Sequence, residues 1–164
     1  MGQGSPCTEN AIAVSVGGLL DDATRTHLPT FGVPVAGVLY EQRCAAYAVI
    51  RSSAGAVAAV HGPAGDWLPG GGRLAGETPE ETVVREVREE LRGTLRFVHK
   101  IGEALQYFFA AAEGRYYAMQ VVFLRAELIE GSHGPAEYAL CWLDVGHPGP
   151  WFFYACHDWA VRQG

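Results

Sequence analysis

Three glutamates stand close together in one short charged segment: Glu86, Glu89 and Glu90. On a helix, the first lies three and four residues before the other two, where like charges destabilise the helix by about 0.2 to 0.5 kcal/mol for each pair. Carboxylate oxygens suit Mg²⁺, which usually shares its coordination shell with the phosphates of a substrate. The pattern therefore indicates a cation site. The alternative is a set of surface charges offset by Arg85 and Arg88.

A glycine-rich loop, "LPGGGRLAGE", precedes this segment and contains Gly70, Gly71, Gly72 and Gly76. Because glycine adopts backbone conformations that other residues resist, the loop can turn tightly and bring its carbonyl and N–H groups close to a ligand. Carboxylates on one helix face beside a loop carbonyl would together form a site for a hard cation.

The loop and the charged segment together resemble the Nudix box, G-x5-E-x7-R-E-U-x-E-E-x-G-U, where U is an aliphatic residue. The matching positions are Gly71, Glu77, Arg85, Glu86, Val87, Glu89 and Glu90. The preceding "WLPGG" also resembles the family's approach to the box. The segments "PTFGVP", "RCAAYAVI", "GEALQYFFA" and "HDWAVRQ" extend the resemblance from about Leu28 to the end of the chain.

Two positions depart from the family pattern. Leu74 stands where the family commonly has Glu, and Arg92 stands where the box ends in Gly. Gly93 follows one position later, and glycine readily takes the left-handed conformation that ends a helix. We therefore expect Gly93 to end the helix one residue late and the three glutamates to be unaffected.

The resemblance implies hydrolysis of a nucleoside diphosphate linked to another group X, giving a nucleotide and phosphorylated X. It also implies that Mg²⁺ or Mn²⁺ is held by Glu86, Glu89 and Glu90 with the Gly70 carbonyl. One of these glutamates would orient or deprotonate the attacking water. Arg85 and Glu77 resemble the family's supporting pair, which fixes the helix against the loop. A non-catalytic Nudix-fold module that binds or senses nucleotides is the alternative.

Further candidates lie outside the box. A further acidic ligand is often present in the family, and the candidates are Glu103 and Glu137. Aromatic faces suit nucleobases, and the candidates for stacking are Trp67, Phe108, Tyr116 and Tyr117. Surface positions for the acids and packing for the aromatics are the alternatives. Group X stays open among ADP-ribose, dinucleoside polyphosphates, nucleotide sugars and oxidised nucleoside triphosphates.

The helix that carries the glutamates is well marked, from Pro79 to Leu91. Thr78 can cap it, and Glu81 completes a T-x-x-E capping box. At about 100° per residue, one apolar sector should face the sheet: Val83, Val84, Val87 and Leu91.

The other elements are β-rich segments separated by turns. Residues 44–52 and 56–62 are predicted to form a hairpin, and residues 66–72 a loop that leaves the sheet. The later strands are predicted at 94–110, 115–128 and 138–145, with a last helix within 150–163. The order β-β-α-β-β-β-α predicts an α+β or α/β/α sandwich, a mixed sheet between helices, which is the Nudix fold by resemblance.

Composition limits the organisation and the partners. A chain of 164 residues that is 49% hydrophobic is expected to form one domain. We place it at 39–164, after a loosely ordered N-terminal arm at 1–38 that leaves a homodimer open. A net charge of -6 with 12 Lys and Arg residues argues against a stable nucleic-acid complex.

The cysteines and the N-terminal apolar run bear on location. Cys7, Cys44, Cys141 and Cys156 form no C-x-x-C pair, which favours reduced thiols. The apolar run at 11–20 follows no Lys or Arg and is too short to span a membrane. We therefore expect a soluble cytoplasmic protein that does not bind membranes.

Overall fold

The computed structural model describes residues 12–13, 28–131 and 140–164. Its strands are β1 (Ile12–Ala13), β2 (Thr30–Phe31), β3 (Leu39–Ile50), β4 (Val57–Gly62), β5 (Gly65–Trp67), β6 (Gly70–Gly72), β7 (Gly93–Ala110), β8 (Arg115–Gly131) and β9 (Leu140–Leu143). The helices are α1 (Pro79–Leu91) and α2 (Ala155–Gln163). The predicted order of the main strands and helices is confirmed, with short additional strands.

The central sheet has the order β1-β3-β8-β7-β2, with β6 also paired to β3. β3 and β8 are parallel, whereas β7 and β8 form a long antiparallel pair joined by the predicted turn. The sheet is therefore mixed, as predicted. β1 and β2 lie in the segment before residue 39, and each adds a short pairing to this sheet.

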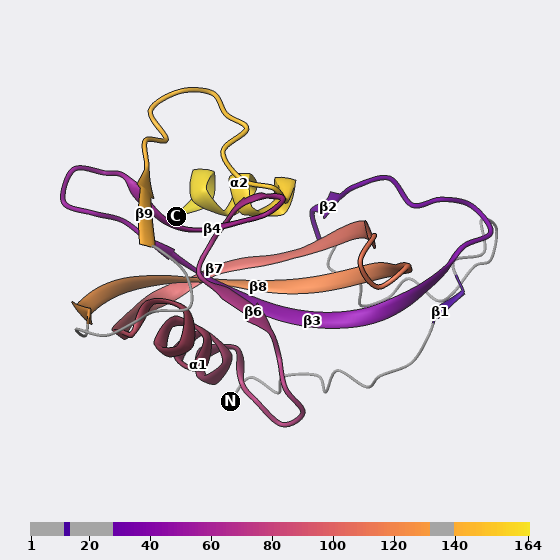
Figure 1. The fold of residues 1–164 in the computed structure, drawn as a ribbon, viewed down its shortest axis with the longest axis horizontal. Helices are drawn as coiled ribbons and strands as arrows, with labels where there is room; N and C mark the ends of the chain where they lie inside the picture. Colours follow the sequence, from indigo (N-terminus) through magenta and orange to yellow (C-terminus); the bar gives the residue numbers. More distant parts are fainter. Residues whose placement is uncertain (1–11, 14–27, 132–139) are drawn as a thin grey trace.

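The two helices cover opposite faces of the central sheet (Figure 1), because β3 is apolar on both faces. Its residues alternate between two cores: Ala45, Tyr47 and Val49 join the core with α2, and Ala46, Ala48 and Ile50 the core with α1. The small sheet β5-β4-β9 lies on the α2 side in Figure 1. The predicted sandwich is confirmed.

Helix α1 begins as predicted, with both hydrogen bonds of the capping box between Thr78 and Glu81. It ends at Leu91, and Arg92 itself takes the left-handed conformation with φ 53° and ψ 32°. The expectation that Gly93 would form this cap is wrong, because Gly93 already begins β7. The backbone thus turns at the position where the family has glycine, although arginine occupies it.

The buried face of α1 is rotated from the predicted apolar sector. Val83, Val87 and Leu91 are buried as expected, but Val84 is 45% exposed and Thr82 is fully buried. At 100° per residue, these buried residues span an arc centred near Glu86 and Glu90. The two glutamates therefore lie on the side of the helix that faces the protein.

The predicted hairpin of β3 and β4 is reduced to a single antiparallel bridge between Arg51 and Val57, and the two strands belong to different sheets. β8 pairs along one edge of β3, while β1 and β6 pair on the other. Both edges are thus occupied, and β4 pairs instead with β5 and β9. The predicted loop at 66–72 likewise contains part of β5 and all of β6.

The expectation of four reduced thiols is also wrong, because Cys44 is disulfide-bonded. Cys141 and Cys156 are free, and Cys7 lies outside the described residues. Since disulfides are rare in reducing compartments, this bond does not support the cytoplasmic location, which stays a prediction. Within the described residues, no helix has the length and apolar character needed to cross a membrane.

Candidate active site

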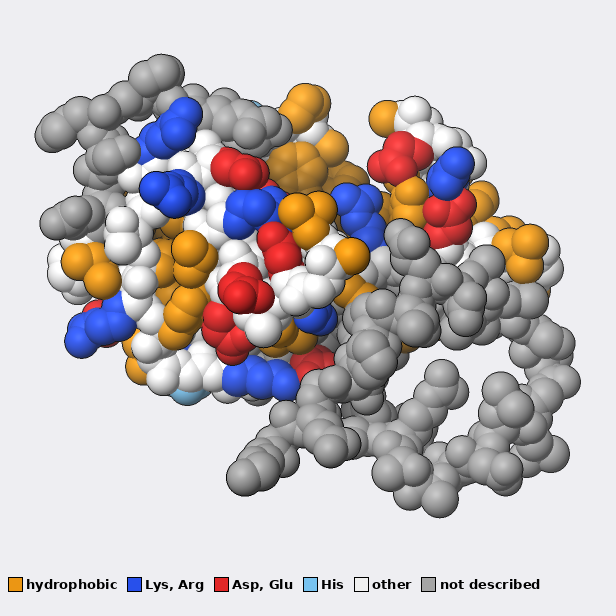
Figure 2. Space-filling view, turned by 90° about the horizontal axis from the view of Figure 1, so that it is seen from below, with side chains coloured by type: hydrophobic (Ala, Val, Ile, Leu, Met, Phe, Trp, Pro, Cys, Tyr) orange, Lys and Arg blue, Asp and Glu red, His pale blue; other side chains and the backbone are white. Residues whose placement is uncertain are grey.

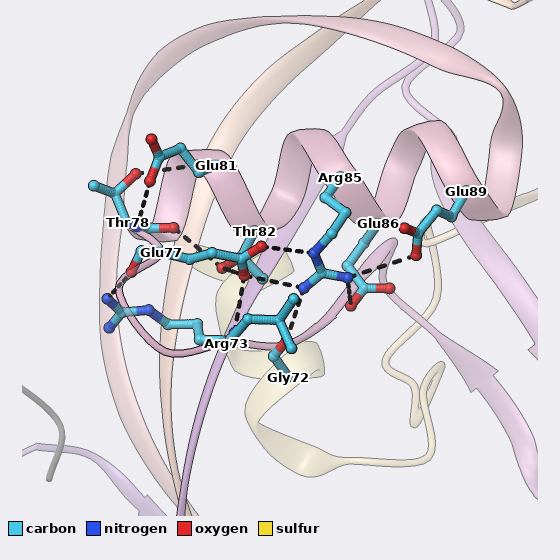
Figure 3. Close-up of polar contacts among 10 residues, drawn as sticks. Gly72, Arg73, Glu77, Thr78, Glu81, Thr82, Arg85, Glu86 and Glu89 are labelled. Carbon is cyan, nitrogen blue, oxygen red and sulfur yellow. Dashed lines mark hydrogen bonds and ion pairs between the residues drawn. The ribbon is translucent and has the colours of Figure 1, made fainter.

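Arg85 is the centre of the polar contacts between α1 and the glycine-rich segment (Figure 3). Its Nε and Nη2 donate to the two carboxylate oxygens of Glu77 at 2.7 and 3.0 Å, and Nη2 also donates to the Gly72 carbonyl at 3.0 Å. Its Nη1 donates to Glu86 at 2.7 Å and lies 3.6 Å from a Glu89 oxygen. One guanidinium thus ties the helix to β6 and holds two of the three glutamates.

Glu77 completes this contact from the loop side. Its carboxylate also accepts hydrogen bonds from the Leu74 backbone N–H at 2.9 Å and the Thr82 hydroxyl at 2.8 Å. The hydrogen bonds from Arg85 are the main reason that the pKa of Glu77 is lowered to about 2. The pKa of Arg85 is raised, chiefly by the same bonds. Leu74 contributes its backbone here, although its side chain departs from the family pattern.

Glu90 and Glu86 lie against β6, where glycine makes room for them. The Gly70 N–H donates to Glu90 at 3.1 Å. A Cβ at Gly71 would lie 2.6 Å from Oε1 of Glu86. At Gly70, φ is 137° and a Cβ would lie 2.3 Å from the Ala46 carbonyl oxygen, so only glycine fits between β3 and the helix.

Glu89 differs from the other two glutamates. Its side chain is 55% exposed, against 18% for Glu86. Figure 2 views the side of the molecule that carries α1 and shows Asp and Glu side chains interleaved with Lys and Arg. Glu89 therefore stands at the outer edge of the site, with Arg85 as its nearest recorded cation.

A cavity of about 320 Å³ adjoins these carboxylates on the α2 side of the sheet. It is lined mainly by apolar and aromatic residues: Arg43, Tyr47, Val60, Gly62, Pro63, Trp67, Gly70, Glu90, Phe108, Met119 and Tyr154. Glu90 belongs to the box, and Gly70 is the residue directly before it. Two predicted stacking residues, Trp67 and Phe108, line the cavity.

The other two predicted aromatics have different positions. Tyr117 stacks on Phe108 with ring centroids 5.5 Å apart, and it supports that ring without lining the cavity. Tyr116 packs on Tyr40 and Phe109 instead. Because successive residues of a strand point to opposite faces, Tyr116 lies on the face of β8 away from Tyr117 and the cavity.

Of the two acidic candidates outside the box, the structure describes only Glu103. Its carboxylate accepts hydrogen bonds from Lys100 and Gln120. Burial raises the pKa of Glu103, but these bonds outweigh it and hold the pKa below the usual range. Glu103 does not line the cavity, and Glu137 lies outside the described residues.

Several cavity residues were not predicted, and they come from distant segments. Burial raises the pKa of Tyr154 to about 12 and raises that of Tyr47 further, so both phenols are neutral. Neither hydroxyl donates or accepts a hydrogen bond among the described residues. Tyr154 lies in a segment predicted only as part of a helix, and no local pattern marked it.

Buried His157 supports the segment that leads to β6. Its Nδ1 accepts a hydrogen bond from the Leu68 N–H at 3.1 Å, and its ring packs on Tyr47 with centroids 4.3 Å apart. Burial lowers the pKa of His157 to about 3, so the ring is neutral. Its Nε2 is buried and has no partner among the described residues. Helix α2 is thereby joined to the backbone just before Gly70.

The carboxylates are suited to a hard cation by their chemistry. Within the described residues, no three His, Cys, Asp or Glu side chains are grouped so as to hold a metal ion. However, the Arg85 guanidinium lies between Glu86 and Glu89, so positive charge is already favoured there. Oxygen donors from one helix beside a glycine strand fit Mg²⁺ or Mn²⁺, provided that Glu86 turns from Arg85.

Comparison with known proteins decides the family. The sequence model of the NUDIX domain matches residues 41–151, which is more than half of the chain. The chain belongs to the Nudix family. Among curated proteins, none matches this Nudix chain.

Solved structures show the same Nudix fold. A MutT Nudix hydrolase from Burkholderia pseudomallei is 24% identical, with a TM-score of 0.54 over 74% of this chain and 97% of that one. An ADP-ribose pyrophosphatase from Streptococcus suis 89-1591 is 17% identical, with a TM-score of 0.53 over 73% and 88%. A UDP-X diphosphatase is 16% identical, with a TM-score of 0.54 over 74% of this chain. The present chain spans 62% of the length of that diphosphatase.

Proposed function

We propose that this Nudix enzyme hydrolyses the pyrophosphate bond of a nucleoside diphosphate linked to a group X, giving a nucleotide and phosphorylated X. The carrying observation is that Glu86 and Glu90 lie against the glycine strand β6, beside an aromatic cavity. The names of two structural neighbours, an ADP-ribose pyrophosphatase and a UDP-X diphosphatase, support this substrate class.

Glu86, Glu89 and Glu90, with the Gly70 carbonyl, would hold Mg²⁺ or Mn²⁺. Such a cation, when bound, neutralises the pyrophosphate charge and helps to activate the attacking water. Glu90 would also orient that water, a role supported by its position beside the cavity and by the hydrogen bond that its carboxylate accepts from the Gly70 N–H. The bonds of Arg85 to Glu77 and the Gly72 carbonyl keep this helix face against β6.

The nucleoside would occupy the cavity. Trp67 and Phe108 provide ring faces for a base, and base–aromatic stacking contributes about 1 to 3 kcal/mol for each base in single-strand binding proteins. The neutral hydroxyls of Tyr47 and Tyr154 provide hydrogen-bonding groups for its polar edge. Tyr116 has no such role, since it lies on the other face.

The non-catalytic alternative is favoured by one observation, the bonding of Arg85 to Glu86 and its proximity to Glu89. A binding module could keep these contacts permanently, whereas an enzyme must release Glu86 to a cation. Turnover therefore separates the two functions.

The test is a screen of nucleotide substrates with Mg²⁺, read by phosphate release, followed by Glu90→Gln with the best substrate. The amide keeps the shape of the side chain but lacks the charge that holds the cation, so kcat should fall at least 100-fold, about 2.7 kcal/mol. Glu80→Gln is the matched control on the exposed first turn of α1 and should keep near-native rates. A near-native kcat for Glu90→Gln would exclude Glu90 as an essential ligand, and nucleotide binding without any turnover would favour the sensor.

A further inference from the structure

Arg43 lies where the cavity meets the glycine strand. It is on β3, and it lines the cavity together with Gly70 and Glu90. Its Nη2 is 3.4 Å from the position that a Cβ at Gly72 would take, so the guanidinium packs directly over β6. Among the described residues that line the cavity, Arg43 is the one cation.

The guanidinium of Arg43 is held in place, but it donates no hydrogen bond to the part of the chain that the structure describes. Its central carbon lies 5.5 Å from the centroid of the Tyr117 ring, a cation–π contact. Its Nη1 is 3.9 Å from a Glu113 oxygen, which is too long for a hydrogen bond. Within the described residues, no hydrogen bond involves this guanidinium. Arg85, by contrast, donates to two carboxylates and a carbonyl.

We propose that Arg43 binds the diphosphate of the substrate between the nucleoside in the cavity and the glutamates of α1. The inference rests on the proposed function, which supplies the anion. A guanidinium presents five N–H donors in a planar fork that matches phosphate oxygens in pairs. The cavity wall is otherwise aromatic and apolar apart from Glu90, which repels phosphate, so Arg43 supplies the attraction on that side. Selectivity for a phosphorylated nucleoside over a free one follows from this residue.

A surface ion pair with Glu113 is the competing role for Arg43. Glu113 is half exposed and accepts a hydrogen bond from the Tyr117 hydroxyl. If that pairing were the whole role of Arg43, removing either partner would have the same effect on the protein. Glu113→Gln therefore separates an ion pair from an anion-binding residue.

The experiment measures binding by calorimetry in EDTA, with ADP, GDP, CDP, UDP and the four matching nucleosides as probes. For the best-bound base, Arg43→Gln should lower the preference for diphosphate over nucleoside about 10- to 100-fold, because a charge-assisted pair is lost. Nucleoside affinity should change less than twofold. Arg43→Lys should retain part of the preference, since it keeps the charge without the planar fork.

Two controls complete the experiment. Arg115→Gln removes an exposed arginine of β8 that bonds Glu41, and Glu113→Gln removes the ion-pair partner. Both should keep the wild-type preference. Any of three results would overturn the inference. The preference for diphosphate could be unchanged in Arg43→Gln, it could fall equally in Glu113→Gln, or the wild-type protein could bind none of the eight probes. Because the experiment measures binding without turnover, its result does not depend on whether the protein hydrolyses the substrate.

Discussion

The buried imidazole of His157 should make the stability of the fold depend steeply on pH. Burial lowers its folded-state pKa to about 3, from 6.5 for an exposed histidine. Between these values the unfolded chain binds a proton that the folded chain does not. Its contribution is therefore complete above pH 6.5 and declines as pH falls toward 3, by about 1.4 kcal/mol for each pH unit. Between pH 6 and pH 4 the loss is about 2.5 kcal/mol.

The variant His157→Asn isolates this effect. Asparagine cannot be protonated in this range, but its carbonyl oxygen can accept the hydrogen bond from the Leu68 N–H. Its smaller side chain should lower stability at every pH, whereas the additional decline toward pH 4 should disappear. Urea unfolding followed by tryptophan fluorescence at pH 7, 6, 5 and 4 measures both quantities. His99→Asn is the control, since this side chain is exposed in the folded state.

The test depends on the difference between wild type and variant, because carboxylates of both proteins titrate in the same range. That difference should change by about 2.5 kcal/mol between pH 6 and pH 4 for His157→Asn. For His99→Asn it should stay constant. A constant difference for both variants would show that His157 takes up a proton in the folded protein, and the burial argument would be refuted.

Two other substitutions test the backbone around the glutamates. Arg92→Gly and Arg92→Ala both remove the side chain. The difference in stability between the two variants therefore measures the cost of the left-handed backbone alone. In thermal unfolding, the Gly variant should be more stable by about 1 kcal/mol. Equal stabilities would contradict the left-handed cap. In Gly71→Ala, the new methyl group would displace the Glu86 carboxylate and should lower kcat/KM at least tenfold, about 1.4 kcal/mol. Gly72→Ala should lose less activity, because the nearest atom to its new methyl group lies 3.4 Å away. Equal losses of kcat/KM in the two variants would exclude displacement of Glu86 as the cause.

The sequence was most informative where structure depends on neighbouring residues. The boundaries of α1 and its capping box were predicted from Thr78, Pro79 and Glu81, because these signals act within one helical turn. The long strands β7 and β8 were also found, since each has an extended β-rich run and a clear turn between them. The register of the Nudix box, and with it the contact of Arg85 with Glu77, is likewise local.

Predictions failed where a segment could form either of two local structures and contacts with residues distant in the sequence select between them. The segments of β3 and β4 look like a hairpin, but β8, far away in sequence, pairs with β3 and changes the neighbours of both. The left-handed cap falls on Arg92, although glycine adopts this conformation more easily than arginine. Gly93 does not form the cap because β7 begins there and requires extended backbone. Local propensity is a weak prior in both cases.

The distinction between local and distant signals also separates the residues proposed for hydrolysis from those proposed for substrate selectivity. The carboxylates that would perform hydrolysis lie within one helix, where a fixed spacing reveals them in the sequence. The cavity is assembled from β3, the β4–β5 region, β6, α1, β7, β8 and the residue before α2, so Arg43 and Tyr154 come together only in the folded chain. Arg43 begins the segment "RCAAYAVI", which resembles the family, but no local pattern assigns a role to either residue. In the proposed function, the identity of the nucleotide would therefore depend mainly on cavity positions outside the box, which can change without altering the glutamates of α1.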